Sequence, residues 1–194
     1  MVKKKKGEHT MDTSNALATI LTRRSIRKFS PRPVNSDLQK TLLRAAFAAP
    51  SAEDAQSKRI IVITDRDMLD ALAGLHPSAG PAREAPLALL ICCDTSATPQ
   101  TIFWPQDCAA ATQNVMLAAR ALGLGSLWCG IHPMEDREQA FMNAFSLPGM
   151  VRPFSLVIAG YPLQDFFDEG RWEPKFVCQD RWGHPFEPVS LPAD

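Results

Sequence analysis

Apolar residues recur at helical spacing in five stretches of the chain. In the first, apolar positions 17, 20 and 21 would share one face of a helix predicted over 14–24, capped by Ser14 or Asn15. A capping-box pattern over Ser36–Gln39 starts a second helix, which we expect to end near Ala48, before Pro50. The same spacing predicts helices over 65–75, 107–122 and 135–145.

The stretch over 107–122 is rich in alanine, which permits close approach of neighbouring backbones. We therefore expect it to be the central and most buried helix, ended by a left-handed cap at Gly123. Short apolar runs, several of them β-branched, predict buried strands over 59–64, 87–93, 126–129 and 154–159.

After Tyr161 and Pro162 the pattern changes to prolines, acidic residues and isolated aromatics. Such a segment cannot build a core of its own, yet its aromatic rings favour burial. We expect an arm from about residue 162 that lies along another surface, such as that of a second subunit. The aromatics of the arm are Phe166, Phe167, Trp172, Phe176, Trp182 and Phe186.

The length of 194 residues predicts one domain over 14–194, preceded by a disordered basic tail over 1–13. The four lysines of this tail, Lys3–Lys6, precede no apolar run of the kind found in a secretory signal. No stretch approaches the roughly 18 apolar residues of a membrane span, so no membrane partner is expected.

The formal net charge of zero conceals an uneven distribution, because residues 1–28 carry eight basic and two acidic side chains. The lysine run is interpreted either as a tail that binds nucleic acid or anionic membrane, or as a solvated segment without a partner. We favour the second interpretation, since the chain has no nucleic-acid recognition motif. The odd number of cysteines, without zinc-ligand spacing, favours reduced, buried thiols in a cytoplasmic protein and no metal site.

Three polar segments carry candidate chemistry. In an extended stretch, Arg23, Ser25 and Arg27 would form a guanidinium–hydroxyl–guanidinium row suited to a phosphate, although cations also favour a helix C-terminus. The loop over 48–56 offers polar side chains that suit the edge of a heterocycle but also simply form turns. The third segment spans 107–130, and its Gly-x-Gly turn lacks the context of a Rossmann fingerprint.

In this order and spacing, the segments resemble the nitroreductase family of FMN-dependent oxidoreductases from about Ser14 to Trp182. The shared marks are RRSIRKF, APSAEDAQ, AAATQNVMLAARALGLGS and AGYP, followed by a basic and aromatic tail. The resemblance implies an α+β fold, in which helices surround a mixed, mostly antiparallel sheet. It also implies a homodimer with two FMN sites at the interface and C-terminal arms exchanged between subunits.

The resemblance also assigns cofactor contacts. Arg23 and Ser25 would hold the FMN phosphate and ribityl chain, and Arg27 would lie near the flavin pyrimidine. Ser51 and Asp54 would reach the flavin from the partner subunit, and the backbone at Trp128, Cys129 and Gly130 would approach flavin N5. Either Arg171 or Lys175 would add a phosphate contact. The remaining expected cofactor contacts are Arg24, Gln56 and Gln113.

Two features qualify these assignments. Asp54 stands where the family usually has asparagine, and a carboxylate cannot donate a hydrogen bond as an amide does. It must therefore change its partners, meet a cation or turn away. Phe103 and Trp104 form either an aromatic lid over the substrate or ordinary core or interface packing.

The implied activity is ping-pong hydride transfer from NADH or NADPH, through flavin N5, to a nitroaromatic, quinone or similar acceptor. The cofactor carries this chemistry, so no catalytic side chain is expected. The alternatives are a flavin-binding protein without reductase turnover and a specialised relative that fragments flavin or dehydrogenates a ring. A non-catalytic nucleic-acid-binding module is the alternative from another class.

Overall fold

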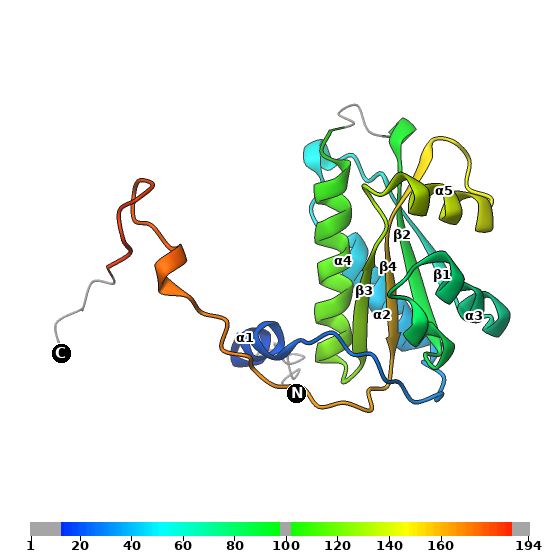
Figure 1. Cartoon of the computed structure of the whole chain (residues 1–194), viewed down its shortest axis with the longest axis horizontal. Coiled ribbons are helices and arrows are strands. Elements are labelled where there is room, and N and C mark those ends of the chain that lie inside the picture. Colours follow the sequence, from blue (N-terminus) through cyan, green and yellow to red (C-terminus); the bar gives the residue numbers. More distant parts are fainter. Residues whose placement is uncertain (1–12, 98–101, 188–194) are drawn as a thin grey trace, which may run out of the picture.

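The computed structural model describes residues 13–97 and 102–187, and its core is a four-stranded sheet with helices on both faces (Figure 1). The strands are β1 (Lys58–Ile63), β2 (Leu87–Asp94), β3 (Gly125–Gly130) and β4 (Val151–Gly160), in the order β1-β2-β4-β3. Each neighbouring pair is antiparallel, and the parallel component is an isolated bridge between Ser25 and Ser126. The expected mostly antiparallel α+β fold is confirmed.

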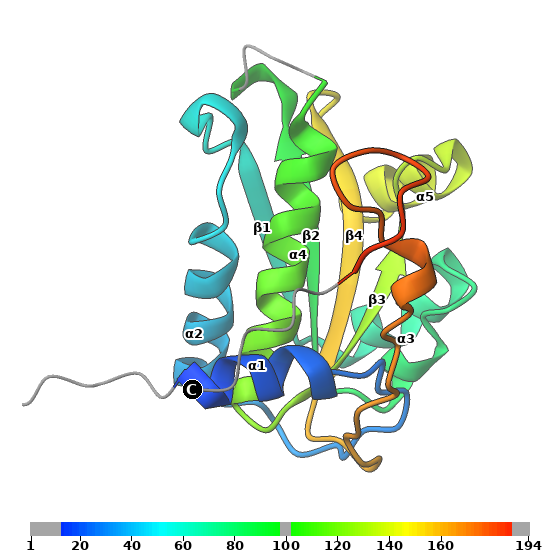
Figure 2. The ribbon, with the colours of Figure 1, turned by 90° about the vertical axis from the view of Figure 1, so that its left-hand side faces the viewer.

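Each face of the sheet is covered by its own helices (Figures 1 and 2). One face packs against α2 (Ser36–Phe47) and α4 (Trp104–Ala121), and the other lies under α3 (Arg66–Leu75) and α5 (Glu135–Ala144). Strand β2 is central and buried on both sides: Leu89 and Ile91 face the first cluster, whereas Leu90 and Cys92 face the second. Its continuous apolar run follows from this double burial.

Helix α4 has eight buried residues and is flanked by α2, α1 (Thr13–Thr22) and the sheet, as expected of a central helix. It begins at Trp104, three residues earlier than predicted, because Pro105 fits the first helical turn. Gly123 follows it with φ +72°, which confirms the predicted left-handed end.

Two predicted caps are wrong. Helix α1 begins at Thr13, so Ser14 and Asn15 lie inside it. Helix α2 is capped by Asn35 rather than by Ser36, because the Leu38 N–H donates to the Asn35 side chain at 2.9 Å. The Gln39 amide donates to the Val34 carbonyl instead of closing a capping box.

Short 3-10 turns complete the described elements: η1 (Ala52–Asp54), η2 (Gly80–Arg83), η3 (Thr95–Ala97) and η4 (Pro174–Phe176). The C-terminal segment beyond Tyr161 passes α1 and extends away from the sheet (Figure 1). Four of the five cysteines are buried as predicted, but Cys178 on this arm is exposed, because the arm has no core around it. The lysine run Lys3–Lys6 and the rest of the predicted tail over 1–12 lie outside the described residues.

Candidate functional site

The arginine-rich segment over 23–27 runs directly from α1 onto the edge strand β3. The Ile26 N–H donates to the Ser126 carbonyl at 2.9 Å, and the Ile26 side chain is buried in the core. Backbone pairing on one side and the buried Ile26 on the other fix the segment against β3. The flanking arginines are thereby held at the surface of the sheet edge.

Gly125 makes this close approach possible. A Cβ at this position would lie 2.8 Å from three atoms of the Ile26 side chain. Real Cβ contacts are almost never that short, so a larger residue would push the arginine segment away from β3. The Gly-x-Gly pattern at 123–125 therefore has two separate uses: a left-handed helix end and a site of close backbone contact.

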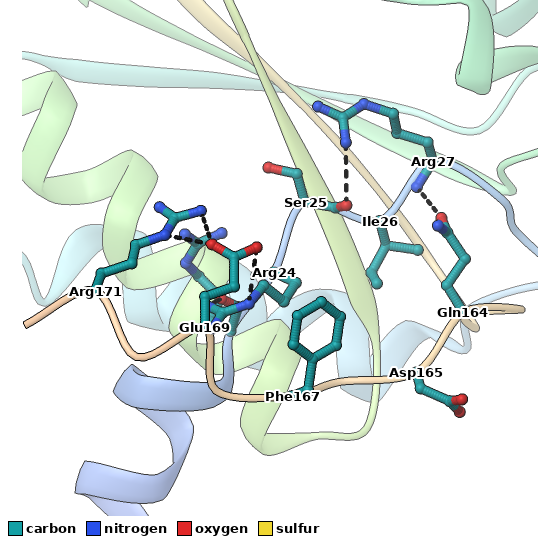
Figure 3. A pocket seen from close by; sticks show the side chains of 10 residues that line it. Arg24, Ser25, Ile26, Arg27, Gln164, Asp165, Phe167, Glu169 and Arg171 are labelled. Atoms are coloured by element: carbon teal, nitrogen blue, oxygen red, sulfur yellow. Dashed lines mark hydrogen bonds and ion pairs between the residues drawn. The ribbon is translucent and has the colours of Figure 1, made fainter.

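The segment and the start of the C-terminal arm enclose a polar pocket of about 320 Å³ (Figure 3). The arginine segment contributes Arg23, Arg24, Ser25 and Arg27 to its lining, and the arm contributes Gln164 and Arg171. Arg23 Nη1 is buried and has no hydrogen-bond partner among the described residues. Burial and the neighbouring Arg24 and Arg171 charges lower the pKa of Arg23, which marks a strongly cationic environment.

These residues fit a phosphate. Guanidinium groups present paired donors that match phosphate oxygens, and a buried donor without a partner is costly unless a ligand satisfies it. The predicted alternation is incomplete, because Arg24 also reaches the pocket with a side chain only 11% exposed. Arg24 thus lines the pocket together with Arg23, Ser25 and Arg27, although strict alternation would have placed its side chain on the opposite side.

The arm is fixed to this segment by specific contacts that the sequence analysis did not identify. The N–H groups of Arg27 and Lys28 both donate to the Gln164 side-chain oxygen, at 2.6 and 2.9 Å. The guanidinium of Arg24 lies over the Phe167 ring, 5.2 Å from its centroid. Gln164 carries no local pattern that would have revealed this role, because its partners are more than 130 positions away.

The structure brings Arg171 into the pocket but not Lys175. The Arg171 guanidinium pairs with the Glu169 carboxylate, which also lies 3.4 Å from Arg24 Nε (Figure 3). Lys175 instead pairs with Glu173 at 3.3 Å and belongs to a different, apolar hollow of the arm. The position of Glu169 among the arginines was not predicted, since in the sequence it is one of several acidic residues in the same stretch of the arm.

At the other end of β3, the predicted residues lie together around Gly130. Trp128 packs edge-on to Phe154, and Cys129 is buried with its thiol directed at the Ser78 carbonyl. The Gly130 carbonyl accepts a hydrogen bond from Arg137 at 3.0 Å and lies 2.8 Å from the His76 ring nitrogen. Its Cβ position is open to 4 Å within the described chain, so a ligand has room to approach the backbone.

Arg27 has an electrostatic effect on Cys129, near the end of β3. Burial raises the pKa of Cys129 to about 11, and the positive charge of Arg27 acts in the opposite direction. The charge of Arg27, a pocket residue, therefore acts on Cys129, one residue before Gly130.

The loop with Ser51, Asp54 and Gln56 has an unusual backbone. Glu53, Asp54 and Gln56 have φ values of 53°, 52° and 49°, a region that residues other than glycine rarely adopt. The Gln56 amide donates to the Asp54 carboxylate at 2.5 Å, so Asp54 changes its partners within the loop. Such concentrated backbone strain persists only where surrounding contacts impose it, and it is typical of functional loops.

Asp107 supplies one of these contacts. Its carboxylate, buried in the first turn of α4, accepts a hydrogen bond from the Ala52 N–H at 3.0 Å. At the opposite end of α4, Arg120 donates to Thr22 of α1, which leads into the arginine pocket. These two anchor points are about 20 Å apart along the helix axis. Within one chain, the loop and the pocket therefore lie at opposite ends of α4 (Figure 1).

The other predicted residues take different places. Gln113 is half-buried in the middle of α4 and does not line the arginine pocket. Trp104 is only 8% exposed and packs against His132 and Phe154, which agrees with core packing rather than with a lid. Phe103 remains exposed at the start of α4.

Two further features are absent from residues 13–97 and 102–187. No cluster of three or more His, Cys, Asp or Glu side chains with the spacing of a metal site is present there. No helix in this part of the chain has the length and apolar content needed to cross a bilayer.

Comparison with known proteins places this geometry in context. The model of the Nitroreductase family matches residues 20–100 and 78–161. A protein of Methanothermobacter thermautotrophicus, provisionally named NADH dehydrogenase/NAD(P)H nitroreductase, is 39% identical over 168 residues, covering 87% of this chain and 88% of the relative. A crystal structure from Parabacteroides distasonis with the same provisional name has a TM-score of 0.82 at 35% identity, covering 86% of this chain and 98% of that one.

A third similar protein was solved with its cofactor. It is a provisionally named nitroreductase from Desulfovibrio desulfuricans in complex with FMN, 28% identical with a TM-score of 0.76. The match covers 86% of this chain and 97% of that chain.

Proposed function

The chain belongs to the nitroreductase family, and from this premise we propose that it is an FMN-dependent NAD(P)H oxidoreductase. The observation that carries the proposal is the arginine pocket beside β3, with the buried, unpartnered Nη1 of Arg23. The FMN complex of the Desulfovibrio desulfuricans relative and the NAD(P)H named for the Methanothermobacter relative support the same cofactor pair.

In this proposal Arg23, Ser25 and Arg171 hold the phosphate, and Arg27 lies toward the flavin pyrimidine. A cation near the pyrimidine stabilises negative charge on the ring system. The bound FMN supplies the atom that accepts and donates hydride. The open backbone at Gly130 allows a flat ring to approach, and the hydrogen bond from Arg137 to its carbonyl keeps that strand end in position.

We further propose a homodimer in which each site combines the arginine pocket of one subunit with the Ser51–Gln56 loop of the other. The separation of these segments supports this arrangement, because within one chain they lie at opposite ends of α4. The dimer would also cover apolar surface, since Leu17, Ile20 and Leu21 of α1 are all more than half exposed. The exposed aromatics of the arm would find their burial on the partner.

The proposed reaction is ping-pong hydride transfer, in which NADH or NADPH and then a nitroaromatic or quinone acceptor use the same face in turn. The chain contributes positioning, positive charge and exclusion of water rather than a reacting side chain. Four buried, unpaired cysteines are consistent with a reducing compartment, and we propose the cytoplasm.

Anaerobic spectroscopy tests this function. The protein saturated with FMN should lose flavin absorbance on addition of NADH or NADPH and regain it with a nitroaromatic or quinone. Arg171→Gln should weaken FMN binding about tenfold or more, whereas Lys175→Gln, outside the pocket, is the matched control and should leave it unchanged. Binding of FMN without bleaching by either nicotinamide would contradict the oxidoreductase function and favour a flavin-binding protein.

A further inference from the structure

The arginine pocket already contains an anion from its own chain. Glu169 directs its carboxylate between Arg24 and Arg171, pairs with Arg171, and lies 3.4 Å from Arg24 Nε (Figure 3). The other acidic residue that lines the pocket, Asp165, points away from these guanidinium groups in the same view. Asp168 also lies 3.8 Å from Arg24 Nη2 but does not line the pocket, so Glu169 is the pocket carboxylate that pairs with the cationic wall.

This carboxylate and a phosphate need the same donors. Both present oxygen acceptors to guanidinium N–H groups, the carboxylate from a planar group and the phosphate from a tetrahedral one, and phosphate carries up to about two negative charges. A phosphate that enters with Glu169 in place meets like charge at short range. Its binding is strongest when Glu169 leaves the two arginines.

The position of Glu169 permits such a movement. It lies on the arm rather than in the core, and its side chain is 33% exposed. Gly170, directly after it, has φ +60°, and its N–H donates to Asp168, so Glu169 and Arg171 face each other across a tight turn. A change of this turn separates the pair without disturbing the sheet.

We propose that Glu169 is an internal counter-ion that neutralises the arginine pocket of the cofactor-free chain and yields to the phosphate of FMN. Glu169 thereby sets the affinity of the chain for phosphate-bearing flavins. The proposal rests on the proposed function, because it takes FMN as the ligand of the pocket.

Two consequences of opposite sign follow. In the cofactor-free protein, removal of the carboxylate takes away the ion-pair partner of Arg171 and leaves Arg24 with the more distant Asp168, so stability should fall. In the presence of FMN, the same removal eliminates a competitor, so affinity should rise. If Glu169 merely held the arginines in place, its removal would lower both the stability of the apoprotein and its affinity for FMN.

The test is calorimetric titration and thermal unfolding of full-length apoprotein with Glu169→Gln, which keeps the size of the side chain but removes its charge. We expect the apoprotein Tm to fall by about 2 °C and the Kd for FMN to decrease about tenfold. Riboflavin, which lacks the phosphate, should bind the variant and the wild type equally. Glu169→Lys should bind FMN more tightly still.

Glu173→Gln is the matched control, because Glu173 pairs with Lys175 outside the pocket. It should leave both FMN and riboflavin binding unchanged. Unchanged or weaker FMN binding by Glu169→Gln, or a gain for riboflavin equal to that for FMN, would overturn the counter-ion role while leaving the proposed function intact. If neither wild type nor variant binds FMN, the proposed function itself is wrong.

Discussion

At the scale of single residues, the chain places polar groups in its interior where each restrains a backbone segment. Asp107 is the clearest case, because its buried carboxylate accepts a hydrogen bond from the strained loop after α2. Glu138 behaves similarly: it is almost fully buried and pairs with both Arg152 and His132. These contacts determine loop positions that apolar packing alone would leave undefined.

We expect Asp107→Ala to lower the free energy of unfolding by about 1–2 kcal/mol, because the Ala52 N–H then loses its acceptor. In urea titrations, Asp70→Ala should lower the free energy of unfolding by less, since the ion pair of Asp70 with Arg66 lies at the surface. FMN binding by Asp107→Ala should weaken as well, because the loop with Ser51 and Gln56 is released. Equal stability of the two variants would show that Asp107 does not restrain the loop.

Buried thiols predict a loss of stability at alkaline pH. Burial raises the pKa of Cys92 to about 12 and that of Cys129 to about 11, from an ordinary value of 9.0, and it also raises the pKa of Cys108. Above about pH 9 the unfolded chain releases these protons while the folded chain retains them, so the free energy of unfolding falls as pH rises. Urea unfolding between pH 8 and 10 measures the slope, which Cys92→Ala should reduce.

At the scale of elements, the strand β3 organises the site, because the arginine segment lies against its start and the open Gly130 backbone marks its end. Its close contact with the arginine segment depends on Gly125, since only a residue without a Cβ accommodates Ile26 at this distance. The helix end at Gly123, two residues earlier, sets the direction in which the strand leaves α4.

Gly125→Ala should therefore displace the arginine segment and cost about 1–3 kcal/mol of stability through overpacking. FMN affinity should fall in parallel, as measured by fluorescence titration. Gly74→Ala is the control, because its Cβ would meet nothing within 4 Å near the C-terminal end of α3 and alanine favours a helix. Full FMN affinity in Gly125→Ala would contradict the role assigned to the close contact.

The elements themselves were largely predictable, because apolar periodicity determines which residues face the sheet. The strand predicted over 87–93 and the helix over 135–145 differ from β2 and α5 by one residue each. The cap of α2 was missed because Asn35 and Ser36 are both good caps and local sequence does not choose between them. The left-handed residues Glu53, Asp54 and Gln56 were not predictable, since tertiary contacts rather than residue type impose their backbone.

At the scale of the whole molecule, the site is divided between distant parts of the chain. The arginine pocket depends on contacts between residues 23–28 and residues 164–171, which are far apart in sequence. The family resemblance placed Arg23, Ser25 and either Arg171 or Lys175 in one site, but it gave no role to the acidic Glu169. Only the fold reveals that an anion of the arm lies among the arginines.

The proposed dimer predicts complementation between subunits. Arg23→Ala would disable the pocket, and a Ser51→Ala/Gln56→Ala double variant would disable the loop. After unfolding and refolding an equimolar mixture, about a quarter of the FMN sites should be intact, because half of the dimers are mixed and each contains one site of two unaltered parts. Each variant alone should bind FMN poorly, and analytical ultracentrifugation should show dimers throughout.

A mixture that binds no more FMN than its components would exclude a site shared between subunits. Wild-type protein that sediments as a monomer at all concentrations would exclude the dimer itself.

The C-terminal arm has a consequence for handling and for the fate of the protein in a cell. Trp172, Phe176 and Trp182 are 66–95% exposed on an extended segment whose residues 163–169 contact residues 24–28. In the proposed dimer, a subunit that lacks its partner would expose these aromatic side chains on an extended segment that is accessible to proteases. We expect limited trypsin digestion at Arg171, Lys175 or Arg181 to remove these aromatic side chains and, with them, the ability of the chain to form the proposed dimer.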